Sequence, residues 1–121
     1  LGAGLGQAPA RQVLRGVGLT DATQAATINK VCSSGLYAVM LAARNIRLGI
    51  SEAIIAGGME SMSNAPFLLP QHRSGAKLGH SKALDSIITD GLWDPYHDYH
   101  MGNAAELCAA TKKISRQDQD N

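Results

Sequence analysis

Hydrophobic positions in the first half of the chain follow a helical spacing in two places. Residues 8–18 carry apolar side chains on one face and end at Gly18, which predicts a first helix. From Leu36 to Leu48 apolar residues recur at i, i+3, i+4 and i+7, and Gly49 follows directly. This second pattern predicts a longer helix that packs on most of its faces.

Two other stretches have the character of strands. Residues 26–31 alternate β-branched and polar side chains, which favours a short strand. Glu52 to Gly57 is a continuous apolar run, typical of a strand buried on both faces of a sheet. Helix, strand, helix, strand is the order of an α/β layered fold.

The pattern changes after Ser61. Residues 61–102 hold three of the four prolines and all four histidines, with one short helical stretch near Lys82–Thr89. Such irregular excursions in compact domains are usually functional. Residues 103–113 return to a helical spacing, and Ser115 with Asp118 resembles the capping box that starts a further helix.

Composition and charge exclude several classes of protein. The 121 residues hold 11 Lys and Arg against 10 Asp and Glu, so there is no basic excess for nucleic acid or an anionic membrane. No apolar stretch reaches the length of a membrane span, and the N-terminus lacks the features of a signal peptide. Two cysteines are too few for a disulfide scaffold. We therefore expect a reducing compartment, either the cytoplasm or a mitochondrial or other organelle matrix, and not secretion.

Cys32 is the first candidate for chemistry, because it stands between a predicted strand and a predicted helix. Free N–H groups and the dipole at a helix N-terminus favour negative charge, and a thiolate is a nucleophile. The N–H of Cys32 itself could help to hold an oxyanion, and Gly35 would leave room for a substrate. The alternative is that Cys32 is a small buried hydrophobic residue, as most free cysteines are.

Other candidates are weaker. His97 and His100, with Asp94 nearby, have a spacing that could suggest a metal ligand set, but no convincing third ligand accompanies them. We therefore expect no metal. Cys108 lies within the predicted helix over 103–113 and is interpreted as a packing residue.

Five separated blocks resemble the thiolases, the acetyl-CoA C-acyltransferases. In chain order they are Gly6-Gln-Ala-Pro-Ala-Arg-Gln12, Ile28-Asn-Lys-Val-Cys32-Ser-Ser-Gly-Leu-Tyr-Ala-Val39, Ala56-Gly-Gly-Met-Glu-Ser-Met-Ser63, Asp90-Gly-Leu-Trp-Asp94, and His100-Met-Gly102 with Ala105-Glu106. They span nearly the whole chain, so the resemblance is specific.

The resemblance implies roles for four residues. Cys32 matches the nucleophile that carries the acyl group as a thioester. Leu92, His100 and Met101 match residues that line the pantetheine channel and acyl pocket in acetoacetyl-CoA thiolases. For Met101, simple core filling is an alternative, since Met often fills gaps.

The same resemblance implies the reaction and the partners. The full-length enzyme would interconvert two acetyl-CoA with acetoacetyl-CoA plus CoA, with CoA as substrate carrier and no other cofactor, and would form a homodimer or homotetramer. The alternatives are a degradative 3-ketoacyl-CoA thiolase of broader chain length, a related ketoacyl synthase, or a non-catalytic CoA-binding module. The Gly-His-Pro, Asn-Glu-Ala-Phe and Cys-x-Gly segments of thiolases have no match here, so we expect an N-terminal-half fragment, inactive alone.

The expected fold class is α/β, a partial N-terminal domain of the thiolase-like layered fold with an irregular loop-domain excursion. Residues 1–60 would belong to the core domain with the nucleophile helix, and residues 61–113 to the loop domain. Residues 114–121 would start a further helix.

Overall fold

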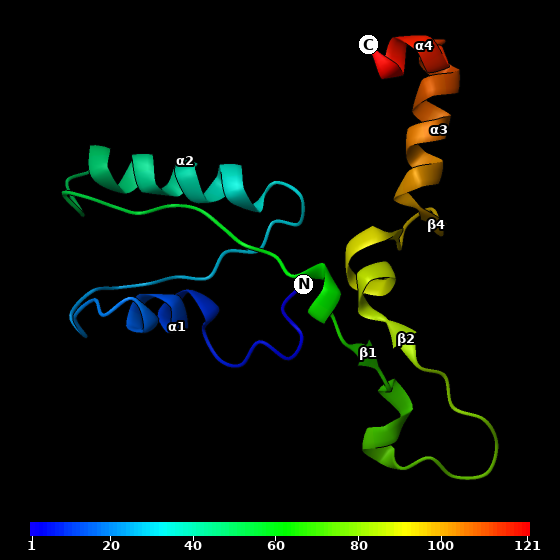
Figure 1. Ribbon diagram of the computed structural model, residues 1–121, viewed down its shortest axis with the longest axis horizontal. Coiled ribbons are helices and arrows are strands. Elements are labelled where there is room, and N and C mark those ends of the chain that lie inside the picture. Colours follow the sequence, from blue (N-terminus) through cyan, green and yellow to red (C-terminus); the bar gives the residue numbers. More distant parts are fainter. The chain divides into compact units, whose positions relative to one another are not determined.

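The computed structural model describes all residues from Leu1 to Asn121 and divides the chain into two units. One unit comprises Gly2–Ser61, and the other comprises Met62–Asn121 together with Leu1. The first holds two of the helices and the second holds the short strands and the remaining helices (Figure 1).

The first helix of the unit Gly2–Ser61 confirms the prediction for residues 8–18. Helix α1 spans Pro9–Gly16, with Pro9 in the first turn where a proline N–H is not needed. Gly18 has a φ of 80°, and its N–H and that of Leu19 donate to the carbonyls of Arg15 and Leu14. These two bonds form a Schellman motif, which explains why the helix ends where the glycine stands.

Helix α2 confirms the second helical prediction and begins two residues earlier than expected. It spans Ser34–Arg47, and Gly49 follows it with a φ of 68°. The N–H groups of Gly49 and Ile50 donate to the carbonyls of Ile46 and Asn45. A Schellman motif therefore closes α2 as well.

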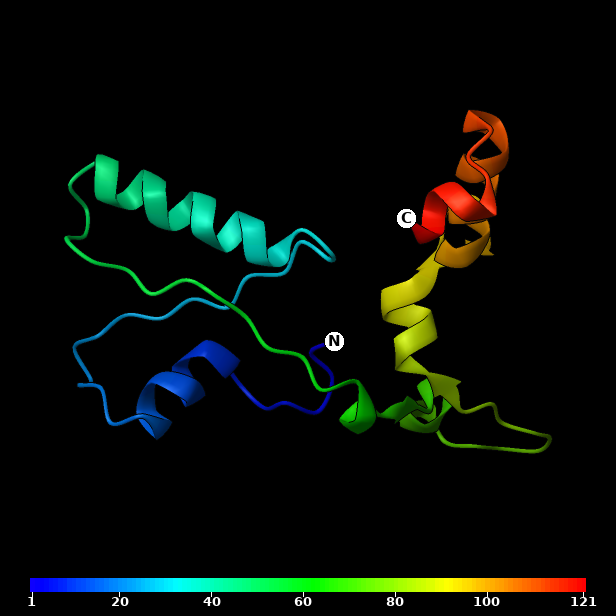
Figure 2. The same cartoon turned by 45° about the horizontal axis from the view of Figure 1, so that its top comes forward.

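The two predicted strands of this unit are extended, but neither is paired in a sheet. Residues 26–31 contribute only an isolated bridge between Lys30 and Cys32, and the run Glu52–Gly57 has no strand partner. The expectation that this run is buried on both faces is wrong for this chain, because Ile55 is 92% exposed. Figures 1 and 2 show the segment after α2 running back beside that helix. An apolar run becomes a buried strand only when neighbours hydrogen-bond to both of its edges, and no such neighbour lies in the unit.

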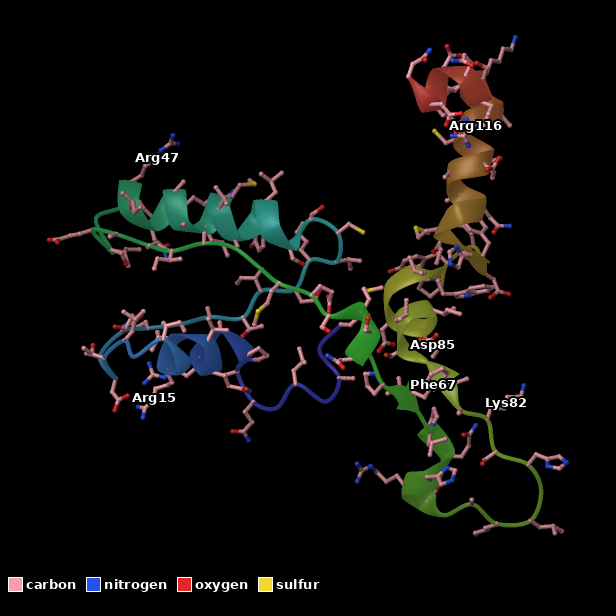
Figure 3. The ribbon with its side chains drawn as sticks, in the orientation of Figure 1. Arg15, Arg47, Phe67, Lys82, Asp85 and Arg116 are labelled. Atoms are coloured by element: carbon pink, nitrogen blue, oxygen red, sulfur yellow. The ribbon has the colours of Figure 1, made fainter.

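The unit that begins at Met62 is built on two short antiparallel pairs. Strand β1 (Phe67–Leu68) pairs with β2 (Leu84–Asp85), with Phe67 opposite Asp85 as Figure 3 shows. Strand β3 (Trp93–Asp94) pairs with β4 (Tyr99–His100). A 3-10 turn at Met62–Asn64 precedes β1, and a second at Pro70–Ser74 lies between β1 and β2. A π-helical stretch at Ile87–Leu92 connects β2 to β3.

The helix predicted near Lys82–Thr89 is wrong in its first half. Leu84 and Asp85 form strand β2, and the helical conformation begins only at Ser86. The Oδ1 of Asp85 accepts from the N–H of Ile87 at 2.8 Å, so this carboxylate starts the helical turn after the strand. A short polar side chain that binds the backbone two residues on competes with continuous helix, and spacing alone does not show this.

The C-terminal helices confirm their predictions. Helix α3 spans Met101–Lys112, beginning two residues before the predicted range, and α4 spans Arg116–Asp120. Ser115 accepts from the N–H of Asp118, and the Asp118 carboxylate accepts from the N–H of Ser115, so the capping box is complete.

Burial is sparse in both units. Leu14 is the one buried hydrophobic residue, and Ser86 is the one buried polar residue. Cys108 is exposed, so its interpretation as a packing residue is wrong for this chain. No helix combines the length and apolar character that a membrane span requires.

Candidate active site

Cys32 lies just before α2, with one residue between it and the helix. Ser33 is the N-cap and Ser34 is the first helical residue. The prediction that Cys32 stands at a helix N-terminus is therefore confirmed. The Cys32 side chain is exposed, so the alternative of a buried hydrophobic residue is wrong for this chain. An exposed thiol at this place can meet an incoming thioester.

A tight turn holds Cys32 in front of the helix. Val31, the preceding residue, has a φ of 50°, in the left-handed region that β-branched residues avoid. The Oδ1 of Asn29 accepts from the N–H of Val31 at 3.0 Å. The N–H groups of Ser33 and Ser34 donate to the carbonyls of Lys30 and Val31, each at 3.1 Å. The backbone thus reverses over three residues and points into α2.

The hydroxyl of Ser34 ties the two sides of this turn together. Its Oγ accepts from the N–H of Lys30 at 2.8 Å and donates to the carbonyl of Val31 at 2.6 Å. Lys30 is also anchored from the helix side, because its Nζ lies 5.3 Å from the centre of the Tyr37 ring. Ser33, in contrast, makes no side-chain capping bond.

The other three predicted site residues meet at one end of the β3–β4 hairpin. Trp93 pairs directly with His100. Leu92 precedes the first of these residues and Met101 follows the second, so the register brings Leu92, His100 and Met101 to the same end. Leu92 and His100 are half-buried, and Met101 is 40% exposed. The Met101 side chain is therefore not core filling within this unit.

Aspartates shape the turn of this hairpin. The Oδ1 of Asp94 accepts from the N–H of Tyr96 at 2.9 Å, and its Oδ2 lies 2.7 Å from Nδ1 of His97. The backbone bond from Tyr96 and then the bond with His97 lower the pKa of Asp94. The Oδ1 of Asp98 accepts from the indole N–H of Trp93 at 3.0 Å. These bonds fix the loop between the two strands and so fix the register that places His100.

His100 is held by the helix that follows it. It is the N-cap of α3, and its Nδ1 accepts from the N–H of Gly102 at 2.9 Å. A ring nitrogen that accepts a backbone hydrogen bond carries no proton, so the neutral ring bears its proton on Nε2. His100 therefore presents an N–H donor to whatever lies beyond it.

Sequence reasoning missed the residues that position the predicted ones. The sequence pattern indicates no role for Asn29 and Ser34 around Cys32 or for Asp98 in the hairpin, and it suggests Asp94 only as a neighbour of a weak metal-ligand candidate. An Asn at the start of a turn is a sequence signal that could have predicted the role of Asn29. The left-handed conformation of Val31 has no corresponding sequence signal. No group of three or more His, Cys, Asp or Glu residues is arranged to hold a metal ion.

Comparison with known proteins identifies the family. The model of the thiolase N-terminal domain matches residues 1–121. The chain is similar to acetyl-CoA acetyltransferase 2 of Arabidopsis thaliana, at 51% identity over 121 residues, and to acetyl-CoA acetyltransferase of Pseudomonas aeruginosa, at 51% over 120 residues. These alignments cover 100% and 99% of this chain, and 30% of each relative.

A solved structure agrees with the sequence comparison. The crystal structure of Acat5 thiolase from Ascaris suum in complex with coenzyme A matches with a TM-score of 0.89 and 38% identity, covering 96% of this chain and 30% of that one. The chain belongs to the thiolase family and has the fold of the thiolase N-terminal domain, as its sequence predicts. It spans about 30% of the length of the relatives it matches.

Proposed function

We propose that this chain is the nucleophile-bearing N-terminal part of an acetyl-CoA C-acetyltransferase. One observation carries the proposal. In a chain about half identical to acetyl-CoA acetyltransferases, Cys32 is exposed and held on a constrained turn at the start of α2. Within this proposal, residues 1–60 belong to the core domain, 61–113 to the loop domain, and 114–121 begin a further helix.

The chemistry begins with the thiolate of Cys32. The thiolate attacks the carbonyl carbon of acetyl-CoA and forms a new S–C bond. The C–S bond to CoA then breaks, and CoA leaves as a thiolate that takes up a proton. The backbone N–H of Cys32 can donate to the carbonyl oxygen as it becomes negative. A second acetyl-CoA, deprotonated next to its carbonyl by a base outside these 121 residues, attacks the acyl group. The new C–C bond releases Cys32 and yields acetoacetyl-CoA.

Leu92, His100 and Met101 are the proposed substrate-binding residues. Leu92 and Met101 supply apolar surface for the pantetheine arm and the acyl group, and His100 supplies the Nε2 hydrogen-bond donor. CoA is the substrate carrier, and the proposal requires no other cofactor and no metal. The structure of the Ascaris suum relative, solved in complex with coenzyme A, supports CoA as a ligand.

The proposed setting follows from the same relatives. Among further relatives, one is named mitochondrial and one cytosolic, which supports the cytoplasm or a mitochondrial or other organelle matrix. The complete enzyme is proposed to be a homodimer or homotetramer that binds neither nucleic acid nor membrane. Lipid metabolism is the proposed context, since acetoacetyl-CoA is made from or returned to acetyl-CoA.

Acetylation of Cys32 tests the proposal directly. The complete enzyme, in which these residues precede the rest of a thiolase chain, is incubated with acetyl-CoA and its peptides are mapped by mass spectrometry. We expect an acetyl group on Cys32 and none on Cys108, which lies in the middle of α3.

Cys32→Ser should lose several powers of ten in thiolysis of acetoacetyl-CoA with an unchanged circular dichroism spectrum, because a hydroxyl is far less ionised than a thiol.

A comparison of substrates with different chain lengths tests the proposed preference for acetoacetyl-CoA. If 3-ketoacyl-CoA with a longer chain is cleaved as fast as acetoacetyl-CoA, the enzyme is a degradative thiolase of broader chain length. An unmodified Cys32, or full activity in Cys32→Ser, would refute the assignment of the nucleophile.

A further inference from the structure

The turn in front of α2 contains a conformation that its own residues disfavour. Val31 has a φ of 50°. This conformation is unfavourable for valine, because its branched Cβ clashes with the backbone. Strained residues of this kind persist only when surrounding bonds hold them. Cys32 is the next residue, so whatever holds Val31 also sets where the thiol points.

The bonds that hold Val31 come from Asn29 on one side and Ser34 on the other. Asn29 fixes the N–H of Val31, and Ser34 fixes its carbonyl. Ser34 does more than Asn29, because its Oγ also accepts from the N–H of Lys30 and thereby joins the entrance of the turn to the first residue of α2. The donor of the hydroxyl and one of its lone pairs are both used inside the turn.

We propose that Ser34 is a positioning residue for the nucleophile. Its hydroxyl holds the strained Val31 turn closed and so fixes the direction of the Cys32 thiol. This inference rests on the proposed function, since it takes Cys32 to be the nucleophile. Ser34 has no role as acid or base in it. Acyl transfer depends strongly on the direction of attack, and a displacement of about 1 Å can cost about 100-fold in rate.

Two adjacent serines provide a matched pair of variants. Ser34→Ala removes the two side-chain hydrogen bonds that Ser34 makes in the turn and keeps the backbone ones, whereas Ser33→Ala removes a hydroxyl that makes no capping bond. In the complete enzyme we expect Ser34→Ala to lower kcat for thiolysis by roughly 10- to 100-fold with little change in KM. Ser33→Ala should stay within about twofold of the parent. Equal effects of the two variants would overturn the inference.

A second readout separates positioning from thiol activation and from loss of fold. Alkylation by iodoacetamide needs an accessible thiolate but tolerates many directions of attack. We therefore expect Ser34→Ala to keep the alkylation rate of Cys32, and its dependence on pH, within about threefold of the parent. A fall in alkylation as large as the fall in kcat would show that Ser34 acts on the reactivity of the thiol, which also overturns the inference.

A suppressor at Val31 tests the role of strain. Glycine adopts a φ of 50° without a steric penalty, so Val31→Gly should lessen the need for the Ser34 bonds. The double variant Val31→Gly with Ser34→Ala should therefore recover most of the kcat lost in Ser34→Ala. If the double variant is no faster than Ser34→Ala, strain at Val31 is not what Ser34 restrains.

Failure of this inference is distinct from failure of the proposed function. The parent enzyme reports on the function through acetylation of Cys32, which does not involve any Ser34 variant. Acetylation at Cys32 with no difference between Ser33→Ala and Ser34→Ala refutes only the role of Ser34. Absence of acetylation at Cys32 refutes the proposed function first.

Discussion

At the scale of single residues, His100 shows how one hydrogen bond can decide chemistry. Its Nδ1 is occupied by the N–H of Gly102, so the imidazole cannot present an acceptor on that side. The same contact leaves little space, because a Cβ added at Gly102 would lie 3.2 Å from Nδ1. A glycine at this position therefore lets helix α3 approach the ring closely enough to be capped by it.

Gly102→Ala should disturb the proposed acyl pocket without touching the nucleophile. The new methyl group pushes the His100 ring away from the helix end and weakens the Nδ1 bond, so the Nε2 donor moves as well. We expect KM for acetoacetyl-CoA to rise severalfold in the complete enzyme while Cys32 still accepts an acetyl group. Asn103→Ala, one residue further along α3, is the control and should change KM by less than twofold.

At the scale of secondary-structure elements, three of the four α-helices end in the same way. Helices α1, α2 and α3 each close with a Schellman motif, and the left-handed residue is Gly18, Gly49 and Lys113 in turn. The two glycines take this conformation without penalty, and Lys113 takes it at a cost. Gly49 lies just after α2, and after that helix the chain turns back beside it (Figure 2).

Gly49→Ala should destabilise the end of α2. An alanine at a φ of 68° costs about 1 kcal/mol, because its Cβ approaches the backbone. We expect a lower unfolding temperature of the complete enzyme and faster amide exchange at Gly49 and Ile50. Gly49→Asn is the control, since asparagine tolerates this conformation and should lose less than alanine does. Equal losses would contradict the assignment of strain.

Helix α4 depends on a charged capping residue, which makes its start sensitive to pH. The side-chain and backbone bonds from Ser115 lower the pKa of Asp118. A lowered pKa in the folded state means that the stabilisation is complete above the ordinary pKa of aspartate and is lost as the pH falls through the lowered value. We expect amide exchange in residues 116–120, corrected for its intrinsic pH dependence, to increase in this acidic range. Asp118→Asn should abolish that dependence because it removes the titrating carboxyl, and its persistence would contradict the cap.

The secondary-structure elements that could be predicted from the sequence are those determined by residues close to them in the chain. Spacing and glycines predicted α1, α2 and α3, and Ser115 with Asp118 predicted the start of α4, because these signals lie within a few residues of their effects. The strand predicted at Glu52–Gly57 required partners that the pattern cannot supply. For the candidate site, Cys32 could be placed before a helix from its sequence neighbours, but the turn of Val31 results from bonds of Asn29 and Ser34 that compete with a steric preference.

At the scale of the whole molecule, the exposed surface is larger than two well-packed units would leave. The chain exposes 10205 Å², whereas a compact monomer of 12.7 kDa would expose roughly 6,200 Å². Two separate compact bodies of half that mass would still expose only roughly 7,500 Å². Large apolar side chains account for part of the excess, among them Ile55 and Leu78. The surface that these residues offer is the kind that other parts of a thiolase, or another subunit, would cover.

The 121-residue chain expressed alone should therefore be inactive and poorly folded. Leu14 and Ser86 are its only buried residues, so each unit has almost no core to stabilise a unique packed state. We expect no thiolysis of acetoacetyl-CoA, strong binding of a hydrophobic dye, no cooperative melting transition, and self-association during size-exclusion chromatography. The control is the complete enzyme at the same molar concentration, which should melt cooperatively, bind little dye and turn over.

A monomeric chain with a sharp transition would contradict the surface argument. Turnover by that chain would show that acid–base chemistry needs nothing beyond these residues.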